Sequence, residues 1–369
     1  MPCSNATNQD ELQFNANRTR SGGKLELCHQ IQNISKPPLF PIPPLGHVMH
    51  VIVAIVAVLI FITGLYGNIV LIRSTIDHTQ KKVRKTMNIF LMTLALYDIL
   101  IITITMPVTL VEDLLLWWPF GRVLCYILYY MPTIFASGSV FTIVTIAAER
   151  YRAVVYPMKP KLSTARAALI SIGIFLIAIA VTVPNMVFAI YDDKTFPNHP
   201  QCSHHFLPDP ILGNKIYVIF VFGCLFWLPL MFTGGLYILI MYHLQVHRHK
   251  TILTINGRMT TETNRRVVTM LLIILLVFVL SWLPLHICFF LAIFGPLNPL
   301  TKDFRLALTI CHIISYLNCA INPIVYVSFK SRVKFISIIC CRQIFKAGRS
   351  MSSSEHTGNP TKNISMKFN

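Results

Sequence analysis

The sequence predicts an all-α membrane protein built as a bundle of seven transmembrane helices. Of its 369 residues, 54% are hydrophobic and only 12% are charged, whereas soluble globular proteins contain about 25% charged residues. Seven apolar segments are each long enough to cross the roughly 30 Å hydrocarbon core of a bilayer. They cover approximately 48–72, 88–111, 123–148, 167–190, 214–242, 267–294 and 306–328.

The charged residues are divided unevenly between the loops that join these segments. With the N-terminus placed outside, 23 of the 32 Lys and Arg residues fall on the inner side and 9 on the outer side. The positive-inside rule then predicts an extracellular N-terminus and a cytoplasmic C-terminus. Basic inner loops next to the anionic inner leaflet also explain the net charge of +18, so this charge does not indicate nucleic-acid binding.

This topology divides the chain into four regions. The first region is polar, lacks an apolar run of signal-peptide length and contains three glycosylation sequons, at Asn5, Asn17 and Asn33. Glycosylation of these sites agrees with an outer location. The regions are an extracellular glycosylated tail over 1–46, a seven-transmembrane domain over 47–329, a juxtamembrane amphipathic helix over 330–345 and a disordered cytoplasmic tail over 346–369.

The cysteines fit the same topology. Cys125 starts the third segment on the outer side and Cys202 lies in the longest outer loop, so both face an oxidising space and could form a disulfide. The pairing of Cys3 with Cys28 stays open. Cysteines inside the segments are interpreted as packing residues, namely Cys224, Cys288, Cys311 and Cys319. Palmitoylation is predicted for the pair after the seventh segment, Cys340 and Cys341, with unmodified thiols as the alternative.

Asp98 is the one ionisable residue deep inside an apolar segment. An intramembrane charge needs a partner and is a functional candidate. Asn68, Ser139, Asn318 and Asn322 could converge on it, the last two being one helical turn apart. Such an oxygen-rich cluster would suit a sodium ion. The alternative is a protonated Asp98 that is hydrogen-bonded among these neighbours.

At the inner end of the third segment stands the triplet Glu149-Arg150-Tyr151. A guanidinium at this interface can pair with a carboxylate or with a partner's backbone carbonyls. Two alternative sets of contacts are what a conformational switch requires.

Short motifs recur in order along the chain. They are Gly67-Asn68, Leu94-Ala95 with Asp98, Trp118-Pro119-Phe120-Gly121, Cys125 with Cys202, Glu149-Arg150-Tyr151, Pro229 with Tyr237, Phe278 with Trp282-Leu283-Pro284, and Asn322-Pro323-Ile324-Val325-Tyr326. Together they resemble the rhodopsin-like (class A) G-protein-coupled receptors over about residues 48–345.

The resemblance implies roles for matching positions. Asp98, Ser139, Asn318 and Asn322 match the family's sodium site, and Trp282 matches the aromatic floor below the ligand. The family's connector, which repacks on activation, corresponds here to Val140, Pro229 and Phe278. The family's inner switch, which opens toward a heterotrimeric G protein, corresponds to Glu149, Arg150, Tyr151, Tyr237, Asn322, Pro323 and Tyr326. The resemblance also implies arrestin and receptor kinases as partners. Asn264 replaces an acid that some members use to hold the arginine, so we expect Glu149 to be the restraint on Arg150.

Single residues argue against two ligand classes of this family. A retinal protein needs a lysine in the seventh segment, where this chain has Tyr316. Amine receptors place an aspartate in the third segment, where this chain has Pro132.

A peptide ligand fits the outer side better. Glu112 and Asp113 lie at the outer end of the second segment and could pair with a basic ligand residue, with a solvated acidic turn as the alternative. The predicted binding residues are completed by Tyr129, Met131, Pro132, Trp282, His286, Phe289 and Tyr316. Packing between helices or against lipid is the alternative for about half of these residues.

The stretch from Tyr129 to Lys161 is similar to the FMRFamide-type neuropeptide receptors. We therefore predict a plasma-membrane receptor for a neuropeptide that is amidated and basic near its C-terminus. The alternatives are a receptor for a lipid or small organic ligand and, in another class, a transporter or channel. Catalysis is not expected, because the sequence contains no metal-spaced His/Cys set, nucleophile triad or phosphate loop.

Overall fold

The structure is a computed structural model that describes residues 47–76, 85–160, 162–194, 199–204, 206, 208–246, 255–295 and 301–354. Within these ranges, the side chains of 47, 85, 255–261 and 330–354 are not described. The glycosylation sites, Cys3 and Cys28, the side chains of Cys340 and Cys341, and the tail beyond 354 therefore lie outside the described part, and the predictions for them stay predictions.

Seven helices within the described residues are long and apolar enough to cross a membrane, which confirms the predicted fold class. The first four spans are α2 (His47–Ile76); α3 (Lys85–Leu100) with η3 (Ile101–Thr105) and α4 (Met106–Leu115); α5 (Gly121–Leu128) with α6 (Met131–Val155); and α7 (Thr164–Val187). A hairpin follows, made of β1 (Ala189–Asp192) and β2 (Gln201–His204). The last three spans are α8 (Pro210–Ile219) with η4 (Phe220–Trp227) and α9 (Leu228–Val246); α11 (Ile255–Phe294); and α12 (Lys302–Ser354).

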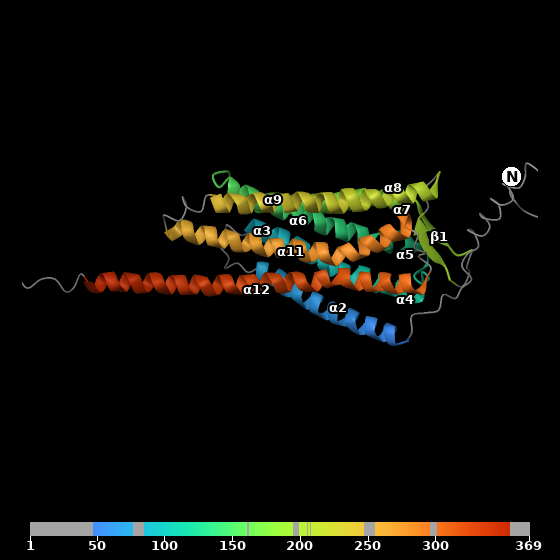
Figure 1. The fold of residues 1–369 in the computed structure, drawn as a ribbon, viewed down its shortest axis with the longest axis horizontal. Coiled ribbons are helices and arrows are strands. Elements are labelled where there is room, and N and C mark those ends of the chain that lie inside the picture. Colours follow the sequence, from blue (N-terminus) through green and yellow to red (C-terminus); the bar gives the residue numbers. More distant parts are fainter. Residues whose placement is uncertain are drawn as a thin grey trace, which may run out of the picture.

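Three of the spans are interrupted just before a proline. Pro107 follows the wide turn η3, Pro229 follows the wide turn η4, and Pro132 follows the break between α5 and α6. Proline has no backbone N–H and its ring clashes with the carbonyl of the preceding turn, so the helix is locally rearranged. Neighbouring helices can stabilise such turns inside a membrane. The interruptions all lie toward the same end of the bundle, where the hairpin is found (Figure 1).

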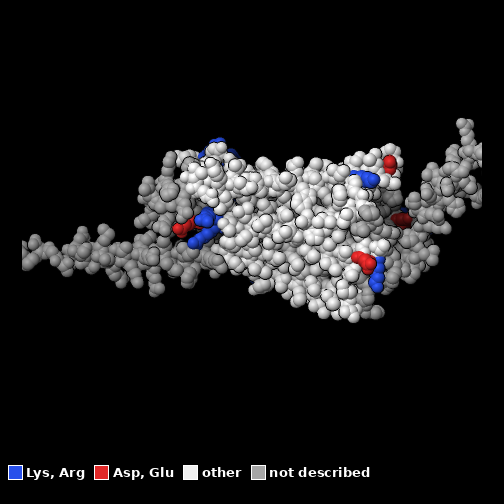
Figure 2. All heavy atoms as spheres, viewed as in Figure 1, with Lys and Arg blue, Asp and Glu red and all other residues white. Residues whose placement is uncertain are grey.

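The third and seventh spans form the centre of the bundle. In the most apolar 18-residue stretch of each of these two spans, 61% of the residues are buried, compared with 22% in the first, fourth and fifth spans. The outer spans instead expose large apolar side chains, which suits contact with lipid. Figure 2 shows that the Lys, Arg, Asp and Glu residues of the visible face gather at the two ends and leave an uncharged band between them. This band is the membrane-crossing part of the molecule.

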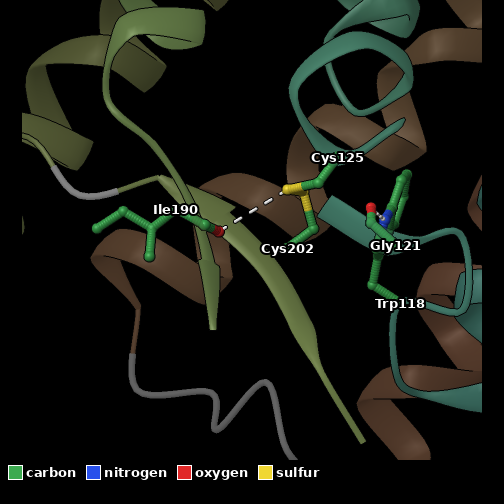
Figure 3. The surroundings of a disulfide bond; sticks show 5 residues. All are labelled: Trp118, Gly121, Cys125, Ile190 and Cys202. Carbon is green, nitrogen blue, oxygen red and sulfur yellow. Dashed lines mark hydrogen bonds between the residues drawn. A yellow bond between two sulfur atoms is a disulfide. The ribbon is translucent and has the colours of Figure 1, made fainter. Parts of the chain in front are cut away.

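A disulfide ties the hairpin to the third span (Figure 3). Cys125 of α5 and Cys202 of β2 are bonded with an S–S distance of 2.08 Å, which confirms the predicted pair. Cys202 is also the register partner of Tyr191 in the antiparallel hairpin. Trp118 lies against this disulfide and donates its indole N–H to the Gly121 carbonyl at 2.9 Å. We call this end of the bundle the disulfide end.

At the opposite end, α12 continues past the bundle to Ser354 (Figure 1). Arg150 belongs to this end as well, because it lies at the far end of the third span from Cys125. A C-terminal helix is therefore present, and it is continuous with the seventh span. The boundary predicted between 329 and 330 stays a prediction. The third span also runs on to Val155, so the Glu149-Arg150-Tyr151 triplet lies within α6, one turn before its end. We call this end the arginine end.

Candidate functional site

An aromatic cluster surrounds His286 toward the disulfide end of α11. The His286 ring centroid is 4.2 Å from those of Phe222 and Phe226, 5.8 Å from Trp227 and 6.1 Å from Trp282. Phe222, Phe226 and Trp227 come from the wide turn η4, so this turn presents aromatic rings to α11. The structure thus brings together the predicted binding residues Trp282 and His286. We call these five residues the His286 cluster.

A second group joins the second span to the seventh. His312 of α12 and Asp113 of α4 are both buried, and His312 Nδ1 lies 2.7 Å from Asp113 Oδ2. The His312 ring is also 6.2 Å from the ring of Phe289 and 6.4 Å from that of Tyr316. Three predicted binding residues, Asp113, Phe289 and Tyr316, therefore meet around a histidine that was not among the predicted binding residues.

Glu112 differs from its neighbour Asp113. Its carboxylate forms no hydrogen bond and no ion pair with the residues that the structure describes, and it is only partly buried. Its charge interacts at longer range with the charges of Asp113, His312 and Arg305. The two adjacent acids thus have different environments: Asp113 is bonded within the fold, and the oxygens of Glu112 remain available.

The predicted binding residues of the third span lie in other surroundings. Tyr129 packs with Trp118 at 6.1 Å and with His204 of β2 at 6.3 Å, so it supports the disulfide and the hairpin. Met131 packs against the apolar core that the first, second, third, fourth and seventh spans share. Pro132 occupies the first turn of α6. Among the described residues, these side chains make no ring contact with the His286 cluster.

A buried polar cluster lies around Asp98. Asn322 Nδ2 donates to Asp98 Oδ2 at 3.0 Å, linking α12 to α3, and both residues are buried. Asn68 of α2 donates to the backbone carbonyls of Gly64 and Cys319, each at 2.9 Å. Oxygen atoms without a hydrogen-bond partner among the described residues include Asp98 Oδ1, Asn68 Oδ1, Ser139 Oγ, Asn318 Oδ1 and Asn322 Oδ1.

These unpartnered oxygens are unusual for a protein interior, because buried polar atoms normally find a partner. All of the unpartnered atoms in the Asp98 cluster are oxygens, and one belongs to a carboxylate. Hard monovalent cations are bound by such atoms together with water. The residues therefore fit a sodium ion.

Aromatic packing connects the His286 cluster to the arginine end. The Phe278 ring is fully buried and stacks on Phe226 at 5.4 Å and on Trp282 at 5.9 Å. Phe278 also belongs to the apolar core that contains Tyr237, Tyr326 and Val140. Four of the predicted connector and switch residues thus share one apolar core, and Trp282 contacts this core directly through Phe278.

Arg150 lies at the arginine end. Its Nε donates to Glu149 Oε2 at 2.6 Å, and both side chains are largely shielded from solvent. Its charge also acts on the buried phenol of Tyr237. Asn264 of α11 makes no bond to Arg150 within the described part of the chain. Tyr151, the third residue of the triplet, packs edge-on against Tyr156 at 6.1 Å.

Residues 67–326 match the family model of the seven-transmembrane receptors of the rhodopsin family. The chain belongs to this family. It is 29% identical to a QRFP-like peptide receptor of Branchiostoma floridae over 85% of this chain and 83% of the relative. It is also 29% identical to neuropeptide FF receptor 2 of Mus musculus, over 75% and 69%, and 30% identical to galanin receptor type 1 of Homo sapiens, over 73% and 75%.

The receptor is therefore a multi-pass membrane protein of a receptor family rather than of an enzyme family. Its sequence predicted that Asn322 lies close to Asp98, but it predicted neither the stacking of Trp282 on Phe278 nor the His312–Asp113 bond. One signal was available: His312 precedes Tyr316 by four residues, which places both on one helical face. The position of Asp113 opposite that face depends on how the two spans are rotated, which a nearly uniform apolar segment does not reveal.

Proposed function

We propose that the receptor binds an extracellular neuropeptide that is amidated and basic near its C-terminus, and that it activates a heterotrimeric G protein. By their names, its relatives are receptors for a QRFP-like peptide, for neuropeptide FF and for galanin. This agreement supports a peptide over the lipid or small organic ligand, and the family match does not favour a transporter or channel.

The observation that carries this proposal is the pair of unlike acids. Asp113 is fixed by His312 at 2.7 Å and holds α4 against α12, so it positions the outer part of the site. Glu112 keeps its carboxylate oxygens available at the disulfide end. A carboxylate accepts two parallel hydrogen bonds from an arginine guanidinium, so Glu112 is suited to an arginine side chain of the peptide.

Neighbouring charges act on Glu112 in opposite directions. The adjacent carboxylate of Asp113 repels the charge of Glu112, whereas the positive charge of Arg305 attracts it. We expect the peptide arginine to gain about 1.4 kcal/mol from Glu112, a factor of about 10 in affinity. The apolar residues of the peptide would pack on the His286 cluster, whose rings offer large contact surfaces.

A double-mutant cycle with the ligand tests this assignment. Glu112→Gln should weaken an amidated Arg-Phe peptide about tenfold in a calcium or cAMP response, and replacing the peptide arginine by neutral citrulline should do the same to the wild type. On Glu112→Gln, citrulline should cause no further loss. Asp303→Asn is the matched control, because Asp303 is an exposed acid at the same end. Full additivity of the two changes would show that the arginine binds elsewhere.

The orientation and the remaining partners belong to the same proposal. The disulfide end would face the outside of the plasma membrane, and the arginine end would face the G protein, arrestin and receptor kinases. The charge distribution between the loops supports this orientation. Loss of the glycan-dependent mass on Asn5→Gln, Asn17→Gln and Asn33→Gln would support it, whereas unglycosylated wild-type receptor at the cell surface would count against it.

We also propose that the Asp98 cluster binds a sodium ion. Asp98, Ser139, Asn318 and Asn322 would supply the oxygen ligands, of which the structure shows the Asp98–Asn322 contact directly. An ion at this place would bridge the second, third and seventh spans and so favour the packed arrangement. Palmitoylation of Cys340 and Cys341 remains a separate prediction.

A further inference from the structure

Two cysteines of different spans meet near the disulfide end. Cys288 Sγ of α11 and Cys311 Sγ of α12 are 3.4 Å apart, and the residues are separated by 23 positions in the sequence. Both are free thiols. They belong to an apolar cluster with Leu285, Phe304 and Leu308.

We propose that Cys288 and Cys311 form a redox-sensitive site that closes into a reversible disulfide between α11 and α12. A disulfide has an S–S distance of about 2.05 Å, so the two sulfur atoms must approach by about 1.4 Å. Thiol rotation about the side-chain bonds contributes to this movement, and the surrounding apolar side chains form no bonds that would have to break. The interpretation of these cysteines as packing residues is thereby extended to a chemical role.

The two thiols differ in solvent exposure, so one of them would be oxidised before the other. Cys288 is partly exposed, whereas Cys311 is buried. A small oxidant therefore reaches Cys288 first. Cys311 lies within van der Waals distance of the Cys288 sulfur and is placed to react with it once it is oxidised. The pair thus has the arrangement of an attacking and a resolving cysteine.

With hydrogen peroxide as the oxidant, the reaction balances in two steps. The Cys288 thiolate attacks one peroxide oxygen, the O–O bond breaks, and the released hydroxide takes a proton to give water, leaving a sulfenic acid on Cys288. The Cys311 sulfur then attacks the Cys288 sulfur, its proton leaves, and the sulfenic hydroxyl departs as a second water. Two thiols lose two electrons, and one peroxide becomes two waters.

The position of the pair links this chemistry to the candidate site. Cys311 directly precedes His312, which holds Asp113, and Cys288 directly precedes Phe289, whose ring lies 6.2 Å from that of His312. A covalent bond between the two sulfurs would fix α11 to α12 at this level. It would restrict the conformations available around His312 and so change the populations of receptor states.

The test uses the purified full-length receptor in detergent and needs no ligand, so its failure is distinct from failure of the peptide proposal. Hydrogen peroxide should remove two alkylatable thiols from the wild type, and peptide mapping should find Cys288 bonded to Cys311. Dithiothreitol should restore both thiols. Cys288→Ser and Cys311→Ser should each abolish the crosslink. Cys319→Ser, a change at another buried cysteine of α12, should leave it intact.

Thermal unfolding followed by tryptophan fluorescence gives an independent readout of whether the bond fits the folded state. The oxidised wild type should unfold at a higher temperature than the reduced form, and Cys311→Ser should show no such shift. Peroxide treatment that yields only sulfinic acid on Cys288, or that leaves both thiols free, would overturn the proposal. A crosslinked receptor with a lowered unfolding temperature would overturn it as well.

Discussion

Arg150 is held by its neighbour in the chain. Its Nε–Glu149 Oε2 distance is 2.6 Å, and no bond from Asn264 reaches it within the described residues. Glu149 and Arg150 both belong to α6, so their contact does not tie α6 to α11. It restrains the receptor only because it keeps the Arg150 guanidinium away from other partners. At the scale of single residues, this contact is the one that we expect to control signalling without ligand.

Glu149→Gln should therefore raise basal activity. The neutral amide holds the guanidinium less strongly, and a change of about 1.4 kcal/mol between the two receptor states corresponds to about a tenfold change in their ratio. GTPγS binding to membranes without ligand measures this effect. Glu262→Gln, at an exposed acid of the same end, is the control. Unchanged basal binding would show that Glu149 is not the restraint.

Asp98 allows a second test at this scale. If its cluster binds sodium, the unfolding temperature of the wild type should rise when sodium chloride replaces choline chloride, because a ligand bound to the folded state stabilises it. Asp98→Asn removes the charged oxygen and should abolish this difference. Equal sodium effects in the wild type and the variant would contradict the assignment.

The elements themselves were largely predictable, because apolar length alone identifies a span. The interruptions inside the second, third and fifth spans were harder to predict from the sequence. Each precedes a proline, yet Pro184, Pro284 and Pro323 stand inside continuous helices. Whether a proline breaks a helix depends on the neighbours that satisfy the freed backbone groups, and these neighbours are set by tertiary packing.

The packing of α3 on α6 depends on one glycine. A methyl group on Gly138 would overlap the buried ring of Tyr97, which lies next to Asp98 in the chain. Gly138→Ala should therefore lower the stability by about 1–3 kcal/mol, as expected for overpacking. Gly234→Ala is the matched control, since a methyl group there would meet no atom within 4 Å. Thermal unfolding in detergent measures both; equal effects of the two changes would contradict the close α3–α6 contact.

Across the whole molecule, the disulfide end and the arginine end are joined by the two most buried spans. The third span carries Cys125 at one end and Arg150 at the other, and it was this arrangement that the sequence predicted. The sequence could not predict the rotations that place His312 on Asp113 or Cys288 on Cys311, because these contacts join spans through side chains far apart in the chain. The stacking of Trp282 on Phe278 joins the His286 cluster to the apolar core that contains Tyr237.

Nucleotide exchange on a purified heterotrimeric G protein shows whether the receptor converts peptide binding into G-protein activation. The receptor is reconstituted in lipid nanodiscs, and GTPγS uptake is followed with and without an amidated Arg-Phe peptide. We expect the peptide to accelerate GTPγS uptake until the effect saturates, and the Glu112→Gln variant should need about ten times more peptide. The proposal of a peptide ligand would be wrong if no peptide of an amidated library accelerated GTPγS uptake while a lipid or small organic ligand did.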